Sequence, residues 1–261
     1  MAPYCATPAG LRLDLVDTDG VTVTKTLDLM AEENGVRVSS LDVAYPTVRE
    51  VTAANPTDNG EFDYTSLFGP RVVTVAGTVV PSAFGSRQAM LAELSSWCAP
   101  WLRPHLVYCI DPTEATLWLT VRGSQFTAPV SDRTVTAFTV SWVAADPMAQ
   151  TLSATTLELA PGQTATARND GNFPAWPTIT LRGPCTDPEV AGVAFSGLAL
   201  GSAEHVVISP RNRTVYLMGD PRRPRYGLVD FARTRWRPLR PGDNEVSSSA
   251  PATVEWRHTY I

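Results

Sequence analysis

The stretch NDGNFPAWPTITLRGPCTDP, residues 169–188, constrains the fold more than any other part of the chain. It begins with a turn-forming Asn-Asp-Gly triplet, and the residues before Pro174 and Pro177 are held in extended backbone. Residues 178–182 then alternate polar and apolar side chains until a Gly-Pro pair ends the pattern. Because proline is confined to the first residue of a strand or to an edge, the stretch predicts a strand that opens a sheet.

The chain before this stretch is also rich in predicted strands. Leu11, Leu13 and Leu15 point one way, a turn covers 17–20, and alternation continues through residue 27, which is typical of a β-hairpin. The further strands that the pattern predicts in this half of the chain are 36–43, 71–80, 106–110, 115–122 and 134–143.

One helix is predicted between these strands. Ser86 can cap its first turn, and Pro100 forbids its continuation. The apolar side chains that share one face are Met90, Leu91, Leu94 and Trp97. An apolar stripe of this width normally packs on a sheet, so we interpret it as core rather than as a cofactor site.

Residues 46–68 show little periodicity, although they contain Phe62, Tyr64 and Phe68. The sequence predicts a long irregular excursion here. Excursions of this kind are usually functional or contact another chain.

The second half of the chain has no helical pattern. Its predicted strands are 156–159, 178–182, 205–208, 214–218, 227–231 and 252–260, separated by Gly, Pro, Asn and Ser clusters. Short strands at such spacing favour a β-sandwich or jelly roll. Periodicity and aromatic residues are lost over 144–156, so we place a domain boundary there, between 148 and 149.

Composition excludes several classes of protein. The hydrophobic fraction of 44% is that of a globular protein, and the apolar run 190–203 is too short to span a bilayer. The N-terminus has no basic segment leading into an apolar core, so we expect no signal peptide and folding in a cytoplasm. Cys5, Cys98, Cys109 and Cys185 form no CxxC pair, so we predict free thiols, with no metal, cofactor or disulfide.

No catalytic motif occurs in the sequence. Glu204 and His205 are adjacent, but neighbours in a strand point to opposite faces, so we interpret His205 as a sheet-edge residue. The sequence brings no two of the candidate glycosidase carboxylates to the required separation: these are Asp132, Asp146, Asp187 and Glu189. We therefore assign no catalytic residue.

Charge is distributed unevenly along the chain. Residues 211–240 hold nine arginines and two aspartates, a net charge of +7, whereas residues 1–70 hold four basic and eleven acidic residues, a net charge of -7. Because the whole chain is acidic, we favour a protein partner or a solvated sandwich edge over nucleic acid. Arg233, Arg235 and Arg237 are the predicted partner-docking residues.

Several segments resemble the siphophage distal tail proteins, the Dit family. In the second half these are GNFPAWPTITLRGPCTDP, RTVYLMGD, WRPLRPGDNEV and VEWRHTYI; in the first half they are LDVAYPTVREV and NGEFDYTSLFGPRVVTVAGTVV. The resemblance covers nearly the whole chain, and its motifs are structural rather than catalytic.

The resemblance implies a mainly β fold: a ring-forming split-barrel or β-sandwich-like domain with one α-helix over 1–148, and a galectin-like β-sandwich (jelly roll) over 149–261. It implies a structural protein of the virion tail tip, made in the host bacterial cytoplasm, whose homohexameric ring joins the tail tube protein to the baseplate hub. The alternative is a carbohydrate-binding β-sandwich module for host-surface recognition. A lectin would bind glycan without a ring, whereas an adaptor would form rings and bind none.

Overall fold

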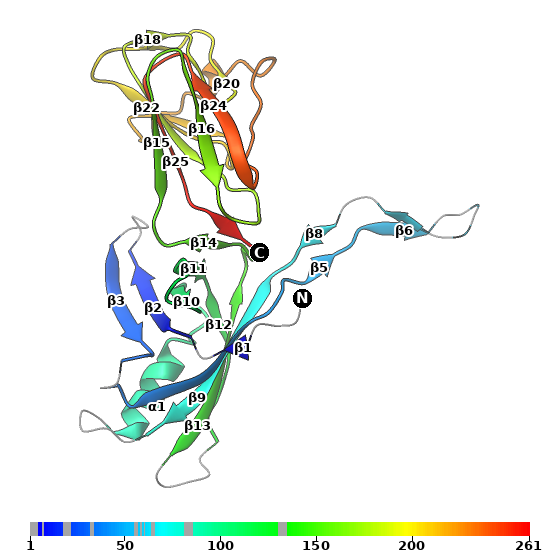
Figure 1. Ribbon diagram of the computed structural model, residues 1–261, viewed down its shortest axis with the longest axis vertical. Helices are drawn as coiled ribbons and strands as arrows, with labels where there is room; N and C mark the ends of the chain where they lie inside the picture. Colours follow the sequence, from blue (N-terminus) through cyan, green and yellow to red (C-terminus); the bar gives the residue numbers. More distant parts are fainter. Residues whose placement is uncertain are drawn as a thin grey trace. The chain divides into compact units, whose positions relative to one another are not determined.

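The computed structural model describes residues 5–6, 8–17, 22–31, 34–54, 57, 59, 61–63, 66–80, 86–129 and 135–261. The chain divides into two compact units, the first running to Leu152 and the second spanning Ser153–Tyr260. Both are built mainly of β-strands, as the sequence predicts (Figure 1).

Two antiparallel sheets form most of the first unit. One has the order β1 (Cys5–Ala6), β4 (Val36–Val43), β9 (Arg71–Val79), β13 (Thr136–Ala144) and β12 (Arg122–Thr127). The other contains β14 (Ala149–Thr151), β11 (Leu117–Thr120), β10 (His105–Cys109), β2 (Gly10–Val16) and β3 (Val23–Asp28), in that order. The predicted hairpin is confirmed, since β2 pairs with β3.

The strongest predicted strand lies at the centre of its sheet. β9 pairs with β4 on one edge and β13 on the other, and Val73, Val75 and Val79 are fully buried on one face. The alternation of valines in the sequence of β9 therefore corresponds to one face of the strand that is buried in the core.

The predicted helix is α1 (Arg87–Ser96). The Ser86 hydroxyl accepts a hydrogen bond from the Ala89 N–H at 3.1 Å, which caps the first turn. Leu94 and Trp97 are buried, so the apolar face does pack into the core.

One prediction in the first unit is corrected. The predicted strand 115–122 is two strands, β11 and β12, which lie in different sheets because the chain leaves the first ladder at the buried Val121. The first unit runs to Leu152, within the 144–156 stretch, because β14 pairs with β11. The boundary between 148 and 149 stays a prediction.

The predicted irregular excursion is a two-stranded ribbon, the arm (residues 48–68), drawn in cyan in Figure 1. β5 (Val48–Arg49) pairs with β8 (Leu67–Phe68), and β6 (Thr52–Ala54) pairs with β7 (Glu61–Asp63). Its described side chains at 48–53, 57, 59, 66 and 67 are exposed and that of Phe68 is half-buried, so burial imposes no alternation on these residues. The predicted aromatic contacts of Phe62 and Tyr64 fall outside the described side chains.

The second unit is a sandwich of two antiparallel sheets around one core. The first has the order β15 (Thr155–Leu159), β25 (Ala252–Trp256), β17 (Thr178–Arg182), β22 (His205–Ser209) and β23 (Thr214–Leu217). The second has the order β16 (Gln163–Asn169), β24 (Gly242–Ser248), β19 (Glu189–Val190) and β20 (Val193–Ala194). The remaining strands are β18 (Cys185–Thr186), β21 (Ala199–Leu200) and β26 (Thr259–Tyr260).

Strand β17 has the predicted bounds but not the predicted position within its sheet. It pairs with β22 on one edge and β25 on the other, so it is the middle strand of its sheet rather than an opening one. Pro177 lies just outside the strand, and its missing N–H therefore removes no bond from either ladder.

One predicted strand of the second unit is wrong. Residues 227–231 contain the 3₁₀ turn η2 (Tyr226–Leu228) and one isolated bridge between Val229 and Phe195. The chain turns here because the Asp230 carboxylate accepts the backbone N–H of Ala232 at 3.0 Å.

Candidate partner-docking groove

The predicted docking arginines lie on a segment outside the sheets, residues 233–240, here called the arginine segment, which begins in a turn at Arg233 and makes one isolated bridge at Leu239. Buried Thr234 fixes one end: its hydroxyl donates to the Ala194 carbonyl at 3.3 Å and accepts the Ala194 N–H at 3.1 Å. Buried Leu239 fixes the other end through two backbone bonds with Ala175, each 2.8 Å. Trp236 packs against the hydrophobic core between these anchors.

The arginine side chains beside these buried anchors are exposed. Arg233, Arg235, Arg237 and Arg240 are all exposed, and all four line one groove of about 720 Å³. The opposite wall consists of consecutive residues of β24, and Glu189 and Gly192 also line the groove. The structure therefore brings the three predicted docking residues together.

The groove arginines differ in how they are paired. Arg233 bonds the Glu189 carboxylate, with Nη2 and Oε2 2.6 Å apart. The Arg235 guanidinium donates only to backbone carbonyls, of Ala232 at 3.3 Å and Thr234 at 2.9 Å. The side chain of Arg237 has no ion pair or hydrogen bond within residues 135–261, every one of which is described. Among the three predicted docking arginines, Arg237 therefore has the most unused capacity to bind an acidic partner, and the Arg240 side chain is likewise unpaired within residues 135–261.

The rest of the arginine-rich stretch does not contribute to this groove. The five other arginines are absent from its lining: Arg211, Arg213, Arg222, Arg223 and Arg225. The local net charge of +7 is thus divided between surfaces, which the linear sequence could not indicate.

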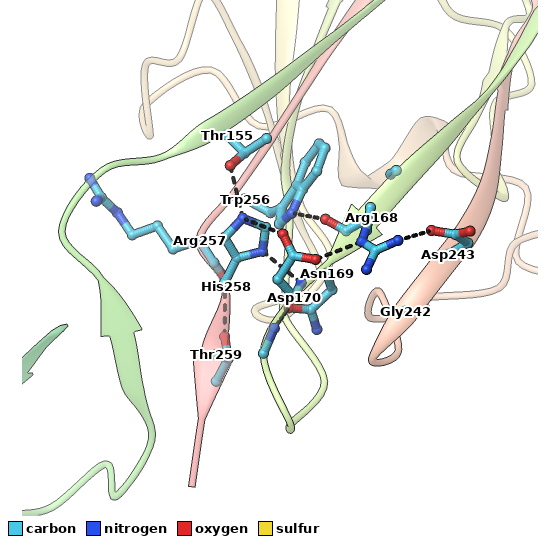
Figure 2. Close-up of polar contacts among 12 residues, drawn as sticks. Thr155, Arg168, Asn169, Asp170, Gly242, Asp243, Trp256, Arg257, His258 and Thr259 are labelled. Carbon is cyan, nitrogen blue, oxygen red and sulfur yellow. Dashed lines mark hydrogen bonds and ion pairs between the residues drawn. The ribbon is translucent and has the colours of Figure 1, made fainter. Parts of the chain in front are cut away.

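A polar network that the sequence analysis missed stabilises the strands beside the groove (Figure 2). Buried Asn169 donates to the carbonyls of Phe173 at 2.8 Å and Leu239 at 3.2 Å, so it holds the second anchor of the arginine segment. Arg168 bonds Asp170 at 2.6 Å and lies 3.8 Å from Asp243. The hydrogen bond from Arg168 lowers the pKa of the Asp170 carboxyl.

His258 lies in the same network, but its geometry is not that of a catalytic triad. Its Nδ1 accepts the backbone N–H of Asp170 at 3.0 Å. Thr155 Oγ1 and Asp170 Oδ2 both approach the other nitrogen, Nε2, at 3.2 and 3.8 Å. A triad places hydroxyl and carboxylate on different ring nitrogens, so this network is interpreted as structural.

The other candidate residues are dispersed. Glu204 accepts the Gly201 N–H at 2.9 Å, whereas His205 begins β22, an inner strand rather than the predicted sheet edge. Asp146 accepts the Met148 N–H at 3.3 Å, Asp187 bonds the Gly197 N–H, and Asp132 lies outside the described residues.

Cys98, Cys109 and Cys185 are half-buried free thiols. Within the described ranges no three metal-ligating side chains gather, and no helix has the length and apolar character needed to cross a bilayer.

The chain is similar to proteins of tailed bacteriophages. The family model SPP1_Dit, the siphovirus-type tail component C-terminal domain, matches residues 170–260. A search of curated protein sequences finds no match. The Dit protein (gp 19.1) of phage SPP1 has the same fold, with a TM-score of 0.70 and 11% identity over 96% of this chain and 99% of that chain. A chain of the phage P2 baseplate in its activated conformation with Ca gives a TM-score of 0.45 and 9% identity over 97% and 98%. The resemblance found from the sequence motifs is confirmed.

Proposed function

We propose that this protein, whose residues 170–260 belong to the siphovirus-type tail component family, is the distal tail protein of a phage, joining the tail tube to the baseplate hub as a hexameric ring. The observation that carries the proposal is the family match combined with a fold shared with SPP1 Dit over nearly the full length of both chains. The SPP1 structure is described as a paradigm of the hub adsorption apparatus in phages that infect Gram-positive bacteria. The role is structural, at the virion tail tip, after synthesis in the host cytoplasm.

The exposed apolar surface of the arm favours the proposed ring. A two-stranded ribbon is at best marginally stable when both faces meet water. Val48, Val51 and Leu67 are nevertheless 48%, 52% and 49% exposed, and Tyr45, which packs edge-on against Phe68, is 56% exposed. A neighbouring copy that covers this apolar surface stabilises the ribbon and closes the ring.

Light scattering tests the ring. We expect a hexamer, alone or with the tail tube protein, and we expect the paired substitutions Val48→Ser and Leu67→Ser to weaken it. Val23→Ser with Leu152→Ser removes similar exposed apolar surface outside the arm and serves as the control. Monomer alone at high concentration, and also with the tail tube protein, contradicts the ring.

The arginine groove is the proposed docking surface for an acidic protein, either the hub or a neighbouring subunit. Replacing Arg233, Arg235 and Arg237 with Ser should reduce partner binding and tail assembly, most clearly at low salt, because screening weakens charge steering. Arg211, Arg222 and Arg223 replaced with Ser give the same change of charge outside the groove. Normal assembly of the groove variant at low and high salt refutes the docking role.

The carbohydrate-binding alternative lacks a stacking surface at this groove. None of the groove residues, which all lie in the fully described range 135–261, is aromatic. Sugar rings are commonly bound by stacking on aromatic faces, so we expect this groove to bind no glycan, and a glycan screen of the assembled protein should give the same result for the wild type and the groove variant.

A further inference from the structure

The wall of the groove opposite the arginine segment is a partly open sheet edge. β24 pairs with β16 along its whole length, from Gly242 to Ser248. On its other edge β24 pairs with β19 only at Ser248, where the Ala191 N–H also bonds the Ser247 carbonyl at 2.9 Å. The edge residues before Ser247 have no neighbouring strand.

Backbone N–H and C=O groups of successive residues in a strand point to opposite edges, which fixes the direction of the unpaired groups of β24. The Ser247 carbonyl points away from β16, so the N–H and C=O groups of Glu245 and Asp243 point the same way. In the fully described range 135–261, neither residue makes a backbone hydrogen bond on this side. Both residues line the groove.

The two walls together define one kind of occupant. One wall offers backbone donors and acceptors at the spacing of a strand, and the other offers Arg235, Arg237 and Arg240. Two of the acidic side chains here are already paired, Glu189 with Arg233 and Asp243 with Arg168. Four arginines and three carboxylates, the third being Glu245, line the groove, so positive charge remains in excess by one.

We propose that the groove binds an extended acidic polypeptide segment by strand addition to the open edge of β24, with the carboxylates of the segment paired to the groove arginines. This mode of recognition rests on the docking role proposed above and specifies its chemistry. Nucleic acid is disfavoured because single strands use aromatic stacking platforms, which the groove lining lacks. A polypeptide with acidic side chains matches both walls, because its backbone pairs with the edge and its carboxylates pair with the arginines.

A proline substitution tests strand addition. Glu245→Pro removes the N–H of residue 245, which faces the groove, without touching the β16 ladder, whereas Glu245→Ala removes the same side chain and keeps that N–H. The probe is a fluorescent ten-residue peptide of alternating Glu and Thr, measured by anisotropy against the full-length protein. We expect binding to the wild type and to Glu245→Ala, and affinity about tenfold weaker for Glu245→Pro.

A modified probe keeps the test independent of protein folding. The same peptide with every amide N-methylated retains its charge but cannot donate a hydrogen bond to a strand from either of its edges, so we expect comparable loss of affinity. Equal binding of both peptides, or no binding of either, overturns strand addition. Unchanged binding to the variant Arg235→Ser with Arg237→Ser overturns the docking role itself, so the two failures are distinguishable.

Discussion

Arg233 and Glu189 form an ion pair at the groove, with Nη2 and Oε2 2.6 Å apart, although the two residues are far apart in the sequence. Their side chains are 61% and 44% exposed. Exposed pairs of this kind stabilise a fold by about 0 to 1 kcal/mol. The larger effect of this pair is to reduce the charge that Arg233 presents to a partner. The three predicted docking arginines therefore differ in how strongly each can bind an acidic partner.

Single substitutions should reveal this inequality. Arg237→Ser should weaken partner binding more than Arg233→Ser, because only Arg233 has an internal carboxylate partner. Titration of the partner at low salt measures both. Equal losses, or a larger loss for Arg233→Ser, would show that the internal pair opens without cost during docking.

Thr234 should be essential to the shape of the arginine segment. Thr234→Val keeps the side-chain volume but leaves the buried Ala194 N–H without its acceptor, which should lower the free energy of unfolding by about 1 to 2 kcal/mol. Thr234→Ser retains the hydroxyl and should cost less. Urea denaturation compares the variants, and identical stability of Val and Ser would mean that the hydroxyl is not the anchor.

Tyr108 should make the protein sensitive to alkali. Burial raises its pKa from the ordinary 10.0 to about 12, so the folded state holds the phenolic proton more tightly than the unfolded state. Its contribution is therefore constant below pH 10 and is lost between pH 10 and 12. The variant Tyr108→Phe should lose less stability over that range, as measured by urea denaturation at several pH values. Burial also raises the pKa of the Cys98 thiol to about 11, but this thiol titrates in the same way in the wild type and in Tyr108→Phe. An equal pH slope in both proteins contradicts this role of Tyr108.

The junction between the two units should be an early site of proteolysis within residues 144–156. Leu152 and Ser153 are exposed and lie between β14 and β15, whereas Ala144, Ala149 and Thr151 are buried. Chymotrypsin at low ratio should cut after Leu152 and leave two β-rich fragments that mass spectrometry can identify. Prior cleavage within β9 or β17, with loss of circular dichroism signal, contradicts independent folding.

The sequence by itself determined the elements whose signals are local. Ser86 and the Leu94 to Trp97 stripe specify the cap and buried face of α1, and the prolines around Trp176 fix where β17 begins. The valines of β9 alternate because one face of that strand is buried. Such patterns depend only on the nearest residues along the chain, so they can be recognised without a partner strand.

Strand pairing is non-local, and only the tertiary structure decided it. The sequence could not place β17 between β22 and β25, because a proline outside the ladder is compatible with either an edge or a centre. Nor did it reveal β16, whose inward residues Ala165 and Ala167 give little hydrophobic contrast. The described side chains of the arm form no buried face, so its pairing leaves no period in that part of the sequence.

The groove shows the same division. Arginine alternates with Thr234 and Trp236 in the sequence, and the structure shows the three arginines exposed and these two residues turned toward the core. The opposing wall, the open edge of β24, and the carboxylate of Glu189 reach the groove only through long-range pairing with β16 and β19. Local pattern therefore determined the direction of the arginines, whereas tertiary packing determined what they face, because an edge is defined by the strand that is missing beside it.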